Sequence, residues 1–201
     1  MLTRARVAAS LLPLIVLAGC AGDDSEDSNP AAADSASACA PVEGDLIDAD
    51  AAPGEPTLAL PLPSGWESNT QMNSELVRLA VTNPGISRDG FAPNVVVTAE
   101  PSPADVQAAF DRQLAGLEAV ADPAGVTPET GEICGHESMT LDYTLPAMGA
   151  IPERPAQVQI IVVPHGQETI TYAITAQASA PSDPSYEQDL ETMFSGVQIN
   201  D

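Results

Sequence analysis

The residues whose types could do chemistry are three cysteines, two histidines and many carboxylates. Cys134 and His136 could offer two ligands to a metal ion, but a structural zinc site needs four. His165 lies in a Pro-His-Gly-Gln segment, which is typical of a solvated turn between strands. The sequence lacks the motifs of serine hydrolases, zinc proteases, phosphate-binding loops and redox dithiols. We therefore expect no metal, no cofactor and no catalytic residue. An unrecognised hydrolase is a third interpretation of function, after the two given at the end of this subsection.

Cys20 has the most informative surroundings of the three cysteines. Arg4 and Arg6 precede an apolar run over residues 7–17, and the tetrapeptide Leu-Ala-Gly-Cys ends at Cys20. This order is typical of a lipoprotein signal peptide, cleaved before Cys20 once its sulfur carries a diacylglycerol. The run is too short for a membrane-spanning helix, which needs about 20 apolar residues. The sequence thus predicts a signal peptide at residues 1–19 and a palmitate-type lipid anchor on Cys20. The alternative is an ordinary signal cleavage site that lies close to Cys20.

The charge of the mature chain restricts its partners. Without residues 1–19, four arginines and no lysine stand against 29 acidic residues, which gives a net charge of −25. Nucleic-acid binding is excluded because it depends on basic residues that neutralise phosphates. Adsorption to anionic lipid through a basic patch is excluded for the same reason. A diacylglycerol supplies the two acyl chains that stable anchoring requires. We expect a protein anchored by lipid to the extracytoplasmic face of the cell membrane.

Composition divides the mature chain into two parts. Residues 20–55 are acidic, rich in Ala, Ser and Pro, and free of basic and aromatic residues. Such a segment cannot bury enough apolar surface to offset its chain entropy, so we expect a disordered tether. Residues 56–201 have the length of one domain with a real core.

Cys39 and Cys134 remain once Cys20 is acylated. Two cysteines in an exported chain predict one disulfide, with two free thiols as the alternative. A bridge would join the end of the tether to the domain.

Hydrophobic periodicity and turn signals predict three strands, a helix, three strands and a second helix. The first strand contains Pro61 and is expected at a sheet edge. Ser102 before Pro103 and Asp183 before Pro184 predict the two helix N-caps, and Gly196 predicts the end of the second helix. The expected strands cover residues 57–63, 76–81, 94–100, 132–143, 156–163 and 169–178.

The last two expected strands form a hairpin around residues 164–167. Short connections between the late strands favour an antiparallel sheet with packed helices, which is an α+β sandwich. In the hairpin we expect one set of apolar residues to lie across from another: Val158, Ile160 and Val162 across from Ile170, Tyr172 and Ile174.

Two apolar loops are candidate ligand contacts. Met148 and Ile151 lie in a loop bounded by prolines, and Ile86 and Phe91 lie in a glycine-containing loop. Apolar loop tips can gate a lipid cleft, and methionine adapts to irregular surfaces. The alternative is that both loops fold back onto a minor core.

On these features the chain resembles the LpqN/LpqT family of actinobacterial lipoproteins. The matching features are the tetrapeptide ending at Cys20, the tether, the entry at residues 55–66, the strand at residues 94–100 with its proline-capped helix, and the late hairpin before the final helix. The resemblance implies a Mog1/PsbP-like α/β/α sandwich and a role in a mycolate-containing envelope. It provides no catalytic residue.

We therefore expect a non-enzymatic cell-envelope lipoprotein that binds or helps to deliver a lipid or glycolipid in envelope assembly. Residues 56–201 hold 19 acidic residues and four arginines, a charge of −15. This charge favours a neutral sugar head group, such as that of an acylated trehalose, over an anionic one. The alternative is a protein-interaction module for an envelope complex or a host partner.

Overall fold

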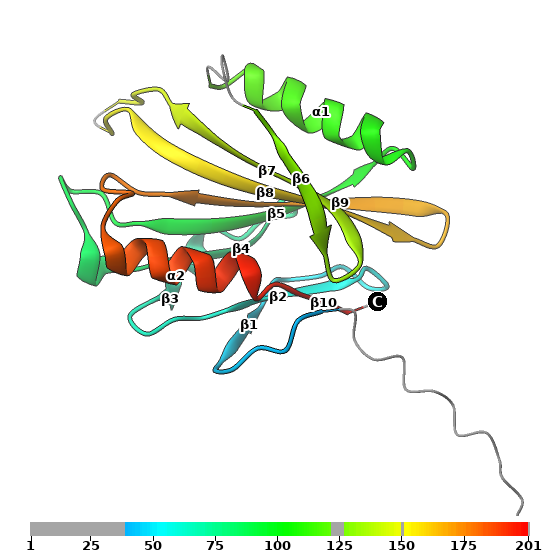
Figure 1. Ribbon diagram of the computed structural model, residues 1–201, viewed down its shortest axis with the longest axis horizontal. Coiled ribbons are helices and arrows are strands. Elements are labelled where there is room, and N and C mark those ends of the chain that lie inside the picture. Colours follow the sequence, from blue (N-terminus) through cyan, green and yellow to red (C-terminus); the bar gives the residue numbers. More distant parts are fainter. Residues whose placement is uncertain (1–38, 122–126, 150, 201) are drawn as a thin grey trace, which may run out of the picture. The chain divides into compact units, whose positions relative to one another are not determined.

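An antiparallel seven-stranded sheet forms the centre of the fold in the computed structural model, which describes residues 39–121, 127–149 and 151–200 (Figure 1). Its central strands are rich in Val, Ile and Thr, which suit a pleated sheet with both faces covered. In spatial order the strands are β3 (Glu67–Ser68), β4 (Val77–Thr82), β5 (Asn94–Ser102), β9 (Glu168–Gln177), β8 (Arg154–His165), β7 (His136–Leu145) and β6 (Glu129–Ile133).

Each face of this sheet carries its own core. On one face, α1 (Val106–Glu118) packs Ala109 and Phe110 against β7 and β8. On the other face, α2 (Pro184–Ser195) packs Tyr186, Met193 and Phe194 into a larger core with β5, β8 and β9. Figure 1 shows the two helices on opposite sides of the sheet. The predicted α+β class, an antiparallel sheet with packed helices, is confirmed.

A small second sheet completes the α2 side. It consists of β1 (Leu46–Asp48), β2 (Thr57–Pro61) and β10 (Gln198–Asn200), with β2 in the middle. The prediction of an edge position for the strand with Pro61 is therefore wrong. Pro61 is the last residue of β2, so its missing N–H falls at the end of the ladder. The two partner strands come from the distant ends of the folded chain and are only three residues long.

The predicted domain boundary at residue 56 is also wrong for part of the tether. Residues 46–48 form β1, and the Glu55 carboxylate pairs with Arg78 at 3.2 Å. The Tyr172 hydroxyl donates a buried hydrogen bond to the Pro56 carbonyl at 2.6 Å. Residues 39–55 thus belong to the folded unit despite their acidic composition, while residues 20–38 lie outside the described residues.

The predicted hairpin register is wrong by one residue. Val162 lies opposite Thr171, and Ile161 lies opposite Tyr172. Because side chains alternate across a strand, a one-residue shift moves each set to the other face. Val158, Ile160 and Val162 therefore pack on the α1 side, whereas Ile170, Tyr172 and Ile174 pack on the α2 side.

Two further boundaries differ from the prediction. The first helix begins at Val106 with Asp105 as its N-cap, not Ser102, because β5 continues to Ser102 and pairs it with Thr169. The expected strand over 132–143 is split into β6 and β7 by a turn at Cys134 and Gly135, both with positive φ. That pair of left-handed residues suits a tight two-residue hairpin. The second helix is as predicted, with Asp183 as N-cap, Pro184 at its start and Gly196 at its end.

Gly196 and Gly116 form a matched pair for testing this packing. A Cβ at Gly196 would lie 2.5 Å from the Pro61 Cγ and 2.8 Å from the Thr192 carbonyl oxygen. Gly196→Ala should therefore lower the free energy of unfolding by about 1–3 kcal/mol. Gly116 lies within α1 with nothing within 4 Å of such a Cβ. Gly116→Ala should raise that free energy by about 0.5–1 kcal/mol. Urea unfolding of both variants measures the two effects, and a wild-type stability for Gly196→Ala would contradict the packing of α2 against β2.

Candidate functional site

The four residues predicted as ligand contacts lie at one end of the seven-stranded sheet. The loop between β4 and β5 and the loop between β7 and β8 meet this end, because Asn94, Gln177, Ala156 and Tyr143 lie side by side in the register. They occupy different environments there. Ile86 packs against the core on the α2 side, Phe91 is half-buried, and Met148 and Ile151 are 65% and 37% exposed.

Local contacts hold each of these loops. Met148 and Ile151 exchange two backbone hydrogen bonds of 2.9 and 3.1 Å. The Arg154 guanidinium lies 4.9 Å from the centre of the Phe91 ring, and Arg154 also donates to the Gln177 side chain at 2.6 and 2.8 Å. The loop with Ile86 and Phe91 thus folds back, and the loop with Met148 and Ile151 stands out. None of these four residues lines the cleft described next. Ligand contact by these four residues stays a prediction.

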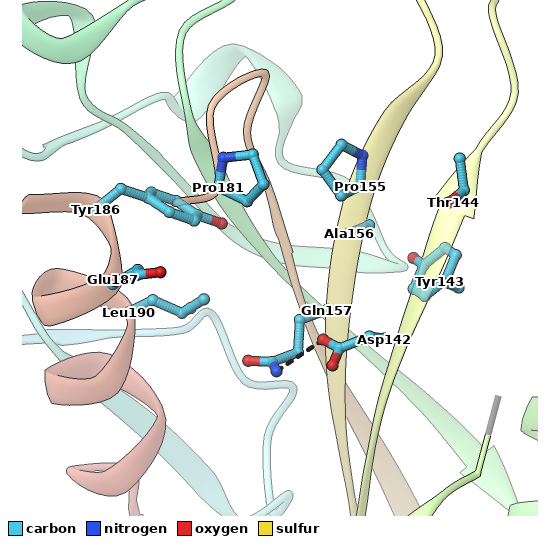
Figure 2. A pocket seen from close by; sticks show the side chains of 10 residues that line it. All are labelled: Asp142, Tyr143, Thr144, Pro155, Ala156, Gln157, Pro181, Tyr186, Glu187 and Leu190. Carbon is cyan, nitrogen blue, oxygen red and sulfur yellow. Dashed lines mark hydrogen bonds between the residues drawn. The ribbon is translucent and has the colours of Figure 1, made fainter. Parts of the chain in front are cut away.

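A cleft of about 540 Å³ opens between α2 and the ends of β7 and β8. Figure 2 shows its α2 wall facing its strand wall. Its volume lies within the range of small-molecule sites. The lining residues are Asp142, Tyr143, Thr144, Pro155, Ala156, Gln157, Pro181, Tyr186, Glu187 and Leu190.

Tyr186 is the anchor of the α2 wall. Its side chain is only 4% exposed, and its ring lies 6.5 Å from that of Trp66. The Trp66 indole N–H donates to the Asp189 carboxylate at 2.7 Å, so both aromatic rings are held against α2. In Figure 2 the Tyr186 hydroxyl points into the cleft. Within the described part of the chain, this hydroxyl makes no hydrogen bond.

The Tyr186 hydroxyl keeps its proton at neutral pH. Burial raises the pKa of this group, and the nearby Asp142 carboxylate raises it further. The neutral hydroxyl can therefore donate one hydrogen bond and accept others inside the cleft. It is the group best placed to meet a polar atom of a ligand.

The strand wall brings polar groups to the same space. Gln157 on β8 donates its side-chain amide to the Asp142 carboxylate on β7 at 2.8 Å. The second carboxylate oxygen of Asp142 and the side-chain carbonyl oxygen of Gln157 accept no hydrogen bond from the described residues. Both therefore stay available as acceptors. Glu187 adds another carboxylate, and none of the lining residues in the described part of the chain is an arginine. The cleft therefore offers acceptors and neutral hydroxyls, among them that of Tyr186, beside the apolar surfaces of Leu190, the prolines and Ala156.

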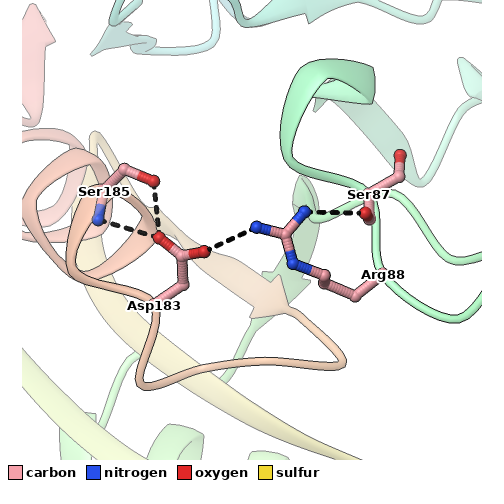
Figure 3. A network of polar contacts seen from close by, with 4 residues as sticks. All are labelled: Ser87, Arg88, Asp183 and Ser185. Atoms are coloured by element: carbon pink, nitrogen blue, oxygen red, sulfur yellow. Dashed lines mark hydrogen bonds and ion pairs between the residues drawn. The ribbon is translucent and has the colours of Figure 1, made fainter.

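A polar network fixes the start of α2 (Figure 3). The Asp183 carboxylate accepts from the Ser185 hydroxyl at 2.6 Å and from the Ser185 backbone N–H at 3.1 Å. Its other oxygen lies 3.1 Å from the Arg88 guanidinium, which also donates to the Ser87 carbonyl at 3.0 Å. The Ser185 hydrogen bonds, more than Arg88, lower the pKa of Asp183. The network ties the loop before β5 to the helix that carries Tyr186 and Leu190.

Cys39 and Cys134 are joined by a disulfide at the turn between β6 and β7. The Ile199 backbone N–H, on β10, donates to the Cys39 sulfur at 3.3 Å. Cys134 is thus engaged in the bridge and is not free to join His136 in a metal site. In the part of the chain that the structure describes, no three His, Cys, Asp or Glu side chains gather as they would around a metal ion. His165 ends β8 opposite Glu168, in the predicted turn region.

The sequence interpretation missed the residues that line the cleft. Tyr186 and Leu190 lie on the apolar side of α2, where Tyr186 belongs to the core and Leu190 packs against it. Asp142 and Gln157 are polar residues between apolar neighbours on two adjacent strands. That alternation was the available signal, but it also describes a strand with one face in water.

The sheet, with α1 on one face and α2 and the small sheet on the other, defines the Mog1/PsbP-like fold. Among solved structures, LpqN of Mycobacterium tuberculosis, described as involved in cell envelope biogenesis, has this fold with a TM-score of 0.61. It is 14% identical, and the similarity covers 78% of this chain and 91% of LpqN. The Ran-binding protein Mog1p of Saccharomyces cerevisiae follows with a TM-score of 0.43 and 11% identity, over 77% of this chain and 95% of Mog1p.

The similarity to LpqN lies in the fold. No protein-family model matches the sequence, and no curated protein matches it significantly. Membership in the LpqN/LpqT family, which the sequence resemblance implied, stays a prediction at this level of identity.

Proposed function

We propose that this protein is a non-enzymatic lipoprotein of the cell envelope that binds a neutral glycolipid in the cleft between α2 and β7–β8. The observation that carries the proposal is the combination in one cleft of apolar surface with hydrogen-bonding groups of neutral or negative charge. Apolar lining with a few polar groups is the usual construction of a site for an amphiphile. The LpqN fold, found in a protein of envelope biogenesis, supports the same setting.

The charges of the cleft favour a neutral head group. Asp142 and Glu187 would repel a phosphate, and among the described residues that line the cleft there is no arginine to compensate. Sugar hydroxyls can donate to these carboxylates and to the Gln157 carbonyl oxygen, and can accept from the Tyr186 hydroxyl. The acyl chain would lie against Leu190 and the prolines.

The anchor on Cys20 belongs to the same proposal. It would hold the cleft near the membrane from which a lipid is taken. No helix in the described residues is long and apolar enough to cross a membrane. We propose the extracytoplasmic face of the cell membrane as the location.

The test is a titration of the unlipidated mature chain, residues 20–201 with Cys20→Ser. The probes are dodecyl maltoside, which is neutral, and lauroyl lysophosphatidylglycerol, which is anionic, both below their critical micelle concentrations. We expect saturable binding of the maltoside and binding at least about tenfold weaker for the anionic lipid. Equal or tighter binding of the anionic lipid would contradict the head-group argument.

Variants of α2 locate the binding site. Leu190→Trp should fill the cleft and weaken maltoside binding by about tenfold or more, whereas Gln188→Trp on the exposed side of α2 should leave it unchanged. Tyr186→Phe removes only the hydroxyl and should weaken binding about threefold to tenfold. Thermal unfolding of each variant serves as the control for folding. Wild-type affinity for Leu190→Trp would place the lipid elsewhere.

A second candidate is a protein-interaction module. Met148 and Ile151 favour it, because both are large apolar side chains exposed on one loop. Saturable binding of neither amphiphile would move the proposal to this function. A catalytic role is not proposed, since neither histidine lines the cleft.

A further inference from the structure

A second chamber lies beside the cleft described above, between α2 and the β6–β7 hairpin. It has a volume of about 380 Å³. We call it the α2–β6 chamber. Ser138 and Thr140 on β7 and Gln159 on β8 contribute polar groups, while Phe194 on α2 and Ile133 on β6 contribute apolar surface. Glu129, Glu132 and Glu191 also line it, and the lining residues that the structure describes include no arginine.

Gln159 is the unusual group in this chamber. It pairs with Ile174 on β9 and with Thr140 on β7, which places its side chain on the α2 face of the sheet. It is only 6% exposed, and its Oε1 atom has no hydrogen-bond partner in the described structure. A buried acceptor without a donor costs stability, and native proteins rarely leave one unpaired. The chamber therefore has a place for a donor that the chain does not provide.

The charge around that place identifies the kind of donor. Glu129 comes from the β6 wall and Glu191 from the α2 wall, so carboxylates stand on both sides of Gln159. An ammonium group carries three N–H donors, no acceptor and a positive charge. It would satisfy Gln159 Oε1 and compensate the carboxylates together, whereas a hydroxyl would provide a donor without the charge. An aromatic wall, here Phe194, suits a cation as well.

We propose that the α2–β6 chamber binds an ammonium group, carried by a polyamine or an amino sugar. The proposal is independent of the glycolipid cleft, because it uses other residues and the opposite charge preference in a ligand. Polyamines and amino sugars share the chemistry of an N–H donor with a positive charge, and the experiment below distinguishes between them.

The experiment follows the Gln159 side-chain amide of the Cys20→Ser mature chain by ¹H–¹⁵N NMR, at physiological ionic strength. The probes are spermidine, glucosamine and glucose, the last two differing at one position in ammonium against hydroxyl. We expect saturable shifts of the Gln159 amide with spermidine or glucosamine, and none with glucose. Binding of spermidine alone indicates a polyamine site, and binding of glucosamine indicates an amino-sugar site. Equal shifts with glucose, or no shift with any probe, would overturn the proposal.

Three variants separate this site from general attraction to an acidic surface. Gln159→Leu, followed through the backbone amides of β7 and β8, should weaken binding of the effective amine about tenfold or more. It should keep or raise the thermal midpoint, because it removes a buried unpaired acceptor. Glu191→Gln, on the exposed side of the chamber, should weaken it about twofold to fivefold without affecting folding. Glu118→Gln, at the end of α1 on the other face of the sheet, should change nothing. Equal weakening by Glu118→Gln and Glu191→Gln would mean that the amines act only as counterions, and would overturn the site.

Discussion

Replacement of both Cys39 and Cys134 by serine is expected to lower the free energy of unfolding by about 4–5 kcal/mol, because the bridge closes a long loop in the unfolded chain. The two cysteines are 95 residues apart in sequence, and the loop between them contains most of the strands. In the folded state the bridge fastens residue 39 to the turn before β7, next to β10. Urea unfolding of the double variant in the Cys20→Ser background measures the effect.

The slope of the urea transition provides a second readout of the same cause. Without the cross-link the unfolded chain is more expanded, so the m-value should rise as the stability falls. Wild-type protein in reductant is the matched control and should behave like the double variant. Alkylation of the unreduced protein should modify neither Cys39 nor Cys134. Complete alkylation of both without reductant would contradict the bridge, as would a loss of stability below about 1 kcal/mol.

Cys20→Ala is expected to abolish acylation and membrane attachment together. The prediction follows from Leu-Ala-Gly-Cys at the end of the apolar run. Each buried methylene contributes about 0.8 kcal/mol to membrane attachment, so two acyl chains hold the protein stably and their loss releases it. Metabolic labelling with a fatty acid, followed by membrane fractionation, checks both effects. The variant should also accumulate as uncleaved precursor.

The double serine variant of Cys39 and Cys134 is the matched control for this experiment. It removes two thiols but keeps Cys20, so it should incorporate the label as the wild type does. Label in the Cys20→Ala variant would show that the acyl chain is attached elsewhere. A correctly cleaved, unlabelled wild type would indicate an ordinary signal peptide.

Local signals predicted much of the secondary structure. The N-cap Asp183, Pro184 and the terminal Gly196 define α2 because helix ends are set by the hydrogen bonds of a few adjacent residues. The strands β5, β8 and β9 are predictable for a similar reason, since their runs of β-branched residues favour an extended backbone by themselves. The first helix begins later than its local signal predicts, because the pairing of Ser102 with Thr169, 67 residues away, prevails over a good local start signal.

The strands β1 and β10 could not be predicted from their own residues. Each has three residues and gains its stability by pairing with β2, which lies between them in the small sheet. Acidic composition correctly marks residues 39–55 as poor in core-forming side chains. It does not register the backbone pairing, the Arg78–Glu55 ion pair or the disulfide, all of which join this segment to distant residues.

The sequence by itself determined the charge of the chain, its small number of basic residues and the α+β class, because these depend on composition or on local periodicity. It also carries the pattern on which the prediction of export and acylation depends. Tertiary structure alone decided which face each strand residue occupies, and with it the candidate site. Asp142, Gln157 and Gln159 read as ordinary polar positions until the strand register places them on the α2 face of the sheet. The docking of α2 over that face then encloses Asp142 and Gln157 with Tyr186 and Leu190, and Gln159 with Phe194. A cleft arises where two elements meet, so neither element's sequence pattern contains it.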